Sequence, residues 1–191
     1  MNEEKNEKTK LTRAFIAIEF SDECVKEIAR VQGLLEKIKF QGKLTELENL
    51  HLTLKFLGEI DDEKLKEARE KLKEIEFSPM KLKLGKIGTF NYKGNPRIVW
   101  IKVEGKAIYD LQKKIDLALK DAGFKSEERF MGHLTIARIK YVKDKKEFDK
   151  HIKSIHVKPI AFSVGEFKLK KSELKPVGPS YMDLEIYSAS E

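Results

Sequence analysis

The sequence predicts an α+β protein of two lobes, in which two pseudo-symmetric β-α-β-α-β halves face each other across a central cleft. The main reason is an internal repeat. Three motifs recur along the chain: the apolar run 13–19 at 97–103, His51–Leu54 at His133–Ile136, and Leu84–Ile87 at Val164–Phe167. Two copies are fewer than a solenoid needs, so we expect them to pack as paired halves.

The first half reads as strand, helix, strand, helix and strand. The near-continuous apolar run 13–19 predicts a buried strand. Ser21 and Asp22 are good N-cap residues for the helix that follows. A second strand begins at His51, and Asp61 or Asp62 caps the next helix. The segment around Leu84 predicts the third strand.

The second half repeats this order. A strand at 97–103 precedes a helix from about 106 to 122, which Gly123 ends in the left-handed conformation that glycine favours. The strand at His133 precedes a shorter helix capped by Asp144. A last strand at about 181–187 closes the chain, and the turn-forming stretch 91–96 joins the halves.

This pattern predicts one domain over 13–188, with repeat 1 at about 13–90 and repeat 2 at about 97–188. Residues 1–12 are charged and polar and lack the apolar centre of a signal peptide, so we expect a disordered lead-in. No apolar run approaches the roughly 20 residues of a membrane span.

Composition narrows the function classes only partly. The net charge of +7 attracts anions such as nucleic acid, but the lysines are spread rather than clustered. One cysteine, Cys24, excludes an internal disulfide and suits a cytoplasmic protein. No long apolar surface stripe remains unassigned, so we expect a monomer.

The repeated His-x-Thr strands carry the chemical signal. Alternate residues of a strand share a face, so His51 and Thr53 point the same way, as do His133 and Thr135. By the same alternation Lys55 shares the face of His51, and Leu52, Leu54 and Phe56 face the core. The cleft between the halves should therefore hold two imidazoles and two hydroxyl groups.

This set suits displacement at phosphorus. One histidine can activate the nucleophile and the other can protonate the leaving oxygen, because imidazole titrates near neutral pH. Threonine hydroxyls can donate to the phosphate oxygens, where charge develops. Lys55 and Arg138 are the nearest cations in sequence.

A lone His-x-Thr tripeptide arises often by chance, and a lone strand histidine is more often structural than catalytic. The recurrence favours a functional role for His51 and His133. His151 and His156 lack such a pattern and read as ordinary residues. Zinc is the chemical competitor, but a catalytic zinc site usually takes three protein ligands. We expect no metal and no cofactor.

His51–Gly58 and His133–Arg138 resemble the two signature motifs of the two-histidine (2H) phosphoesterases. The similarity is to the LigT-like RNA 2′,3′-cyclic phosphodiesterases, first known as 2′-5′ RNA ligases, and it extends over about 13–187. It implies metal-independent hydrolysis of RNA 2′,3′-cyclic phosphate ends to 2′-phosphates, and the reverse 2′-5′ ligation. The implied partner is RNA, with tRNA fragments as one candidate.

The resemblance also implies roles for residues. One histidine protonates the departing O3′ and the other activates water, and we assign His51 as the acid and His133 as the base. Arg138 is expected to hold the phosphate together with Thr53 and Thr135. Strict alternation puts Arg138 on the face opposite His133, so its role requires a bend or a strand end near residue 137.

Two other readings stay open. One is a phosphodiesterase that acts on a small cyclic nucleotide or on the 1″,2″-cyclic phosphate of an ADP-ribose. The other is a non-catalytic module that binds RNA ends. Five aromatic residues could stack on a base, although core packing is the commoner role: Phe56, Phe130, Tyr92, Tyr141 and Trp100.

Overall fold

The computed structural model describes residues 11–176 and 178–190. Its elements, in chain order, are β1 (Thr12–Ile18), α1 (Asp22–Leu35), β2 (Gln41–Leu44), the short 3-10 helix η1 (Leu47–Asn49), β3 (Leu52–Ile60), α2 (Asp62–Lys73), β4 (Met80–Tyr92), β5 (Asn95–Glu104), α3 (Lys106–Asp121), β6 (His133–Tyr141), α4 (Lys145–Ser154), β7 (Ala161–Val164), β8 (Glu166–Lys175) and β9 (Gly178–Ser188). The lead-in was expected over residues 1–12. Residues 1–10 lie outside the described residues, and Thr12 is already part of β1.

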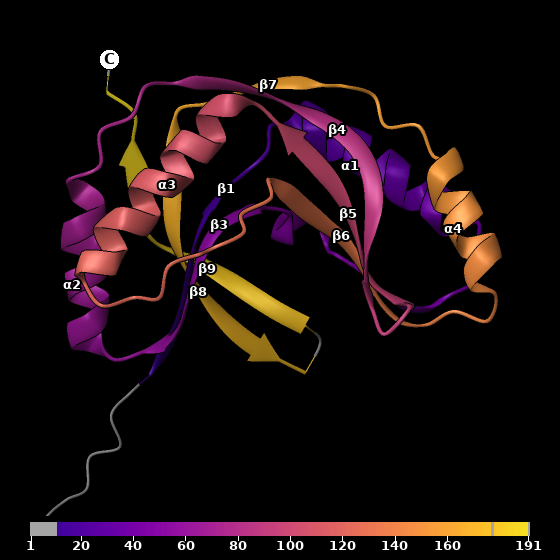
Figure 1. Ribbon diagram of the computed structural model, residues 1–191, viewed down its shortest axis with the longest axis horizontal. Coiled ribbons are helices and arrows are strands. Elements are labelled where there is room, and N and C mark those ends of the chain that lie inside the picture. The colour runs from indigo at the N-terminus through magenta and orange to yellow at the C-terminus, as the bar shows by residue number, and fades with distance from the viewer. Residues whose placement is uncertain (1–10, 177, 191) are drawn as a thin grey trace, which may run out of the picture.

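The expected α+β fold with two repeated halves is confirmed, but the repeats are interleaved rather than side by side. Within the described chain, nine strands form one curled sheet in the order β7-β4-β5-β6-β3-β1-β8-β9, with β2 beside β6. The last strand of repeat 1, β4, therefore pairs with β5 of repeat 2, and β8 of repeat 2 pairs with β1 of repeat 1. Each lobe is built from both repeats (Figure 1).

Within the described residues, the sheet passes from one lobe to the other through one pair of strands. β3 and β6 pair antiparallel with a single register position, Leu52 opposite Leu134. Beyond this position the two strands diverge, and their lobes spread apart (Figure 1). Because His51 and His133 directly precede the joining residues, the junction brings both histidines to the base of the opening.

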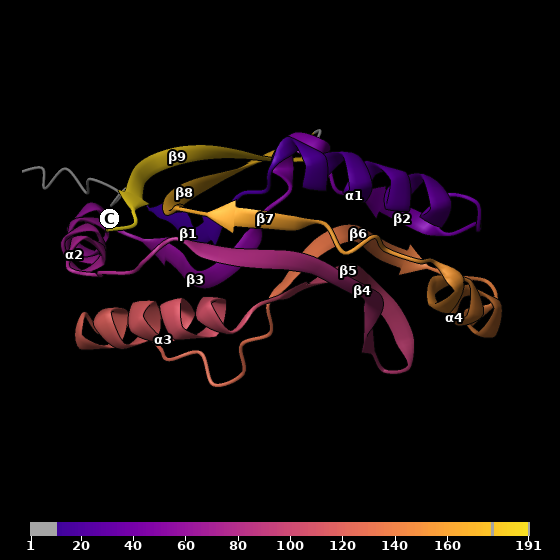
Figure 2. The ribbon, with the colours of Figure 1, turned by 90° about the horizontal axis from the view of Figure 1, so that it is seen from above.

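The helices cross between the repeats in the same way. α1 of repeat 1 contacts β6 of repeat 2, and α3 of repeat 2 contacts β3 of repeat 1. Figure 2 shows α1 and α3 on opposite sides of the molecule with strands between them. The apolar stripe of α3 is buried, as its spacing of three and four residues predicts: Ile108, Leu111, Ile115 and Leu119.

The helix ends follow the predicted caps. The side chains of Ser21, Asp61 and Asp144 each accept a backbone N–H in the first turn of α1, α2 and α4. Gly123, just beyond α3, has a φ of +79°. The turn between the halves is tighter than the predicted stretch 91–96, because β4 and β5 continue to a hairpin whose only intervening residues are 93 and 94.

Two matched β-bulges shape the His-bearing strands. Thr53 and Lys55 pair with consecutive residues of β1, which leaves Leu54 as the extra residue. Thr135 and Ala137 pair with consecutive residues of β5, which leaves Ile136 as the extra residue. A bulge adds one residue to one strand and so reverses the side-chain alternation beyond it.

The bulges correct the predicted orientations of Lys55 and Phe56, and they provide the bend that the role of Arg138 requires. Lys55 was expected to share the face of His51, but it follows the bulge at Leu54, and its buried side chain binds Asp116 of α3. Phe56 was expected to face the core, but its side chain is 66% exposed because the bulge at Leu54 turns it outward. Arg138 follows the bulge at Ile136, and its side chain lines the same cleft as His133. The bend that the role of Arg138 required is therefore present.

Candidate active site

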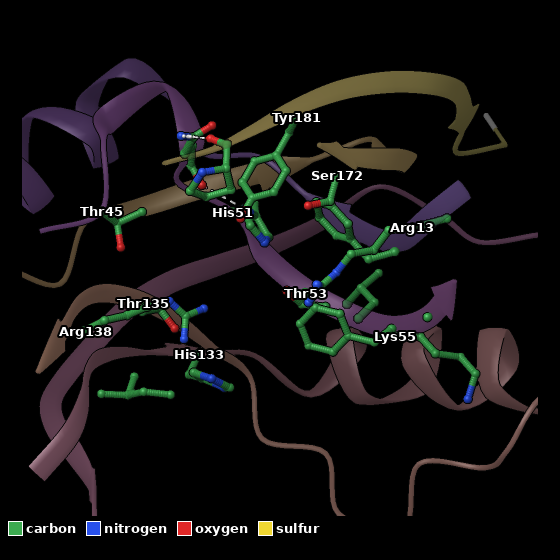
Figure 3. A pocket seen from close by; sticks show the side chains of 18 of the residues that line it. Arg13, Thr45, His51, Thr53, Lys55, His133, Thr135, Arg138, Ser172 and Tyr181 are labelled. Atoms are coloured by element: carbon green, nitrogen blue, oxygen red, sulfur yellow. Dashed lines mark hydrogen bonds between the residues drawn. The ribbon is translucent and has the colours of Figure 1, made fainter. Parts of the chain in front are cut away.

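The cleft between the lobes has a volume of about 610 Å³. All five residues proposed from the sequence line it: His51, Thr53, His133, Thr135 and Arg138. Figure 3 shows His51 and His133 on opposite walls, with Thr135 and Arg138 on the wall of His133. The two strands that the repeat singled out thus bring their polar side chains together.

Both imidazoles are held in the same way. The Nδ1 of His51 lies 2.8 Å from the backbone oxygen of Asn49, and the Nδ1 of His133 lies 2.7 Å from the backbone oxygen of Met131. A carbonyl oxygen only accepts, so each Nδ1 carries the proton and donates it. In the neutral ring Nε2 is then an acceptor, and in the protonated ring it is a donor. Either ring can therefore serve as acid or base through Nε2.

The two rings differ in their surroundings. His51 packs against Phe15 at 4.8 Å and against Tyr181 at 5.1 Å between ring centroids. Burial among these rings lowers the pKa of His51 to about 4, although the hydrogen bond to the Asn49 carbonyl acts in the opposite direction. His51 is therefore neutral at pH 7.

His133 has a simpler aromatic contact. Its ring meets Phe90 edge-on, with centroids 5.0 Å apart. Phe90 in turn contacts Trp100 at 5.5 Å. Gly88 makes room for this arrangement, since a Cβ there would lie 2.4 Å from the Trp100 ring. Trp100 is thus a buried support for the wall that carries His133.

The segment behind Arg138 is closely packed. β2 pairs with β6 beside Arg138, and a Cβ on Gly42 would lie 2.3 Å from the Arg138 backbone oxygen. The glycine lets the two backbones approach and so fixes the position from which the guanidinium enters the cleft. The equivalent position in β3 carries Phe56, which is an aromatic ring in place of a cation.

Lys55, the other cation suggested by the sequence, is not a free phosphate ligand. Its side chain is 3% exposed, and its Nζ donates to Asp116 Oδ1 and to the backbone oxygen of Lys125, both at 2.5 Å. The ammonium group is thus committed to α3 and the segment that follows it.

Of the five aromatic candidates for base stacking, two line the cleft. These are Phe56 and Phe130. Tyr92 and Tyr141 are exposed but belong to other surfaces, and Trp100 is 9% exposed behind Phe90.

The sequence does not predict several other residues that line the cleft, and three of them have polar side chains near His51. Arg13 comes from β1, Ser172 from β8 and Tyr181 from β9, and Figure 3 shows them near His51. Ser172 and Tyr181 are direct cross-strand partners. No local signal marks them, because the β1–β8 pairing joins the two ends of the chain. Burial raises the pKa of the Tyr181 hydroxyl, so it stays protonated.

His151 and Cys24 lie outside the residues that line the cleft. The Nε2 of His151 donates to the Leu34 backbone oxygen at 2.9 Å, and Cys24 is buried. Within the described ranges, no three His, Cys, Asp or Glu side chains are grouped as metal ligands. No helix in the same ranges combines the length and apolarity of a membrane span.

Comparison with known proteins identifies relatives over nearly the whole chain. The family model described as LigT like Phosphoesterase matches twice, at residues 18–100 and 101–181. A Methanocaldococcus jannaschii protein named RNA 2′,3′-cyclic phosphodiesterase is 41% identical over 175 residues, which cover 88% of this chain and 96% of the relative. A Thermotoga maritima protein of the same name is 37% identical and covers 88% and 91%.

Solved structures share the fold. A Thermus thermophilus protein superposes with a TM-score of 0.76 at 26% identity, covering 92% of this chain and 97% of the other. Escherichia coli LigT in complex with 3′-AMP gives a TM-score of 0.76 at 22% identity, covering 95% and 99%. The two matches of the family model correspond to the two repeats of the sequence.

Proposed function

The chain belongs to the LigT-like phosphoesterases, and from this membership and the geometry of the cleft we propose that it is an RNA 2′,3′-cyclic phosphodiesterase. It opens the cyclic phosphate at an RNA end to a 2′-phosphate and a free 3′-hydroxyl. His51 and His133 perform both proton transfers. The observation that carries this proposal is their equivalent placement on opposite walls, each with Nδ1–H donated to a backbone carbonyl and Nε2 left for the substrate.

The reaction is an in-line displacement at phosphorus. A water molecule attacks the phosphorus while the Nε2 of His133 removes its proton. The P–O3′ bond breaks on the opposite side, and the departing O3′ takes a proton from the Nε2 of His51. The cycle leaves His133 protonated and His51 neutral, and exchange with solvent restores the starting states. A 5′-hydroxyl in the place of water would give a 2′-5′ bond, which accounts for ligation.

Because the pKa of His51 is lowered, the substrate phosphate itself must favour protonation of the ring. Before a substrate binds, the neutral ring of His51 is not an acid. A cyclic phosphate carries one negative charge, and an opposite charge at hydrogen-bond distance favours the protonated form of an imidazole. His51 then becomes acid-competent when the phosphate is in place.

The phosphate oxygens are bound by the side chains between the histidines. The hydroxyl groups of Thr53 and Thr135 donate to the non-bridging oxygens, where charge builds up in the transition state. The guanidinium of Arg138 adds a charge-assisted hydrogen bond to the same oxygens. These groups and the two imidazoles supply the charge stabilisation and both proton transfers, so the proposal includes no metal.

A phosphodiesterase for small cyclic phosphates is the second candidate, and the cleft itself argues for RNA. Its walls include Phe56 and Phe130, which offer stacking surfaces for bases, and the open groove accepts a chain. A non-catalytic RNA-end module is a weaker candidate, because binding a phosphate does not need two equivalent Nε2 positions.

We infer that fragments of tRNA are among the substrates, that the protein acts as a monomer, and that it works in the cytoplasm. The single buried Cys24, with no partner for an internal disulfide, suits a reducing compartment. Size-exclusion chromatography with light scattering would test the monomer directly.

The activity is tested with an RNA oligonucleotide that ends in a 2′,3′-cyclic phosphate, in EDTA. The wild-type protein should convert it to the 2′-phosphate, and His51→Ala and His133→Ala should each lose about 100-fold or more of the rate. His151→Ala is the matched control and should retain full activity. Opening of mononucleotide cyclic phosphates alone would favour the second candidate, and binding without turnover would favour the third.

A further inference from the structure

Two buried polar contacts join the repeats at equivalent places. Gln32 on α1 is 5% exposed, and its Nε2 donates to the backbone oxygens of Thr45 at 2.8 Å and Ile136 at 2.9 Å. Asp116 stands on α3, 84 residues later. Its Oδ1 accepts from Lys55 Nζ at 2.5 Å and from the Glu127 backbone N–H at 2.8 Å.

The partners of these residues are also equivalent. Thr45 and Glu127 are 82 residues apart. Lys55 and Ala137 are also 82 residues apart, and each directly follows a bulge. In both cases a residue on a helix binds the wall segment of its own repeat and the bulged strand of the other repeat. The chemistry differs: one contact uses a neutral amide, and the other uses an ammonium and a carboxylate.

We propose that Gln32 and the Lys55–Asp116 pair are positioning residues, two clamps that lock the repeats together and set the spacing of His51, His133 and Arg138. The catalytic part of this inference rests on the proposed function. The geometric part does not.

The clamp at Gln32 reaches two functional groups. Its contact with Thr45 fixes the segment that ends at Asn49, whose carbonyl orients His51. Its contact with Ile136 holds the bulge that turns Arg138 into the cleft. The backbone N–H of Thr45 also donates to the Ile136 oxygen at 2.9 Å, so three segments meet at one carbonyl.

Asp116 belongs to α3, and Figure 2 shows α3 on the side of the molecule opposite α1. Its contacts with Glu127 and, through Lys55, with Lys125 fix the segment that leads to Met131, whose carbonyl orients His133. Burial raises the pKa of Asp116, but the hydrogen bonds from Lys55 and Glu127 outweigh it and leave that pKa below its usual value. The carboxylate is therefore charged at working pH.

The chain provides a matched control for the first clamp. Gln112 on α3 is also a buried glutamine, 6% exposed, but its Nε2 has no hydrogen-bond partner among the described residues. Gln32→Met and Gln112→Met remove the same group from similar surroundings. Only the first removes a contact between the repeats.

The first measurement needs no activity. With only four histidines in the chain, ring 15N signals in NMR spectra report the tautomer and environment of each. Gln32→Met should shift the ring signals of His51, and Gln112→Met should leave them in place. Equal spectra for both variants would overturn the clamp, whatever the enzyme's activity proves to be.

The kinetic measurement separates positioning from stability. Assayed well below its Tm, Gln32→Met should lose about tenfold or more in kcat, because small displacements of reacting groups are costly. Gln112→Met should match the wild type. Equal kcat values for both variants would show that Gln32 is only structural.

The second clamp is tested by replacing both charges. Asp116→Ala leaves a buried ammonium unpaired and should destabilise the fold. The double variant Lys55→Met/Asp116→Leu should recover the Tm but keep a shifted His133 signal and a kcat reduced by about tenfold or more. Recovery of the Tm, the His133 signal and kcat together would overturn the proposal.

Discussion

The strands β3 and β6 share a backbone pattern near the histidines and differ in their side chains beyond the threonine. His51 directly precedes β3 and His133 begins β6; each histidine is followed two residues later by a threonine and then by a bulge. After the bulge β3 presents Phe56 to the cleft, and β6 presents Arg138. The repeat thus places two equivalent His-Thr pairs in the cleft, and the residues beyond the bulges make the two walls chemically different.

The surroundings of the two imidazoles also differ. His51 lies between Phe15 and Tyr181, where burial lowers its pKa. His133 contacts the ring of Phe90. An acid and a base must respond differently to the same substrate, although their backbones are equivalent. The role of each histidine therefore depends on the side chains packed around it.

Replacement of Arg138 should have the largest effect on activity. Arg138→Met removes the cation from the β6 side, and kcat/KM for a cyclic phosphate should fall by about 100-fold, because it removes a fixed charge from the developing phosphate charge. Phe56→Met is the matched change in β3 and should have a much smaller effect. Steady-state kinetics of both variants would check this, and equal losses would contradict a phosphate-binding role for Arg138.

The environment of His51 should appear in the pH dependence of stability. Its pKa falls from the usual 6.5 to about 4 in the folded protein. The unfolded chain therefore binds a proton as pH falls below 6.5, and the folded protein binds it only near pH 4. Stability should decline by roughly 3 kcal/mol across this window.

Chemical denaturation at several pH values tests this decline. In His51→Asn the decline between pH 6.5 and 4 should be smaller by that amount, because the titrating group is gone. A variant with the same pH dependence as the wild type would show that burial does not hold His51 neutral.

Thr53 and Thr135 should contribute equally to kcat, because they occupy equivalent positions in the two repeats. Thr53→Val and Thr135→Val each remove one hydroxyl donor to the phosphate, and each should lower kcat by about tenfold. Thr89→Val, on β4 outside the cleft lining, is a control that should keep full activity. A loss confined to one of the two threonines would show that only one wall binds the phosphate.

The smallest effect should come from Phe56. Phe56→Leu keeps an apolar side chain but loses the ring, so RNA should bind more weakly by about 1 kcal/mol. Inhibition by a non-hydrolysable oligonucleotide measures this, with inorganic phosphate as the comparison ligand. Equal weakening for phosphate would contradict a contact with the base.

The sequence predicts the parts of the site that are local and repeated. His51, Thr53, His133 and Thr135 follow from a four-residue pattern and its recurrence. Arg13 and Tyr181 do not, because they reach the cleft through pairing between strands at opposite ends of the chain. Such long-range pairing has no local signature.

The fold shows the same limit. Hydrophobic periodicity predicts the helices and their caps, but it does not tell which strand pairs with which. The exchange of β4 and β8 between lobes, the small strand β2 and the bulges at Leu54 and Ile136 all depend on tertiary contacts. The bulges matter most, since they alone reverse the expected orientations of Phe56 and Arg138.

The opposite roles of the two equivalent histidines can be separated with a sulfur-substituted substrate. In an RNA end whose cyclic phosphate carries sulfur in place of O3′, the leaving thiolate needs no general acid, because a thiol is far more acidic than an alcohol. His51→Ala should open this substrate within about tenfold of the wild-type rate, while His133→Ala stays inactive on both substrates. Rescue of neither variant, or of His133→Ala instead, would contradict the assignment of His51 as the acid and His133 as the base.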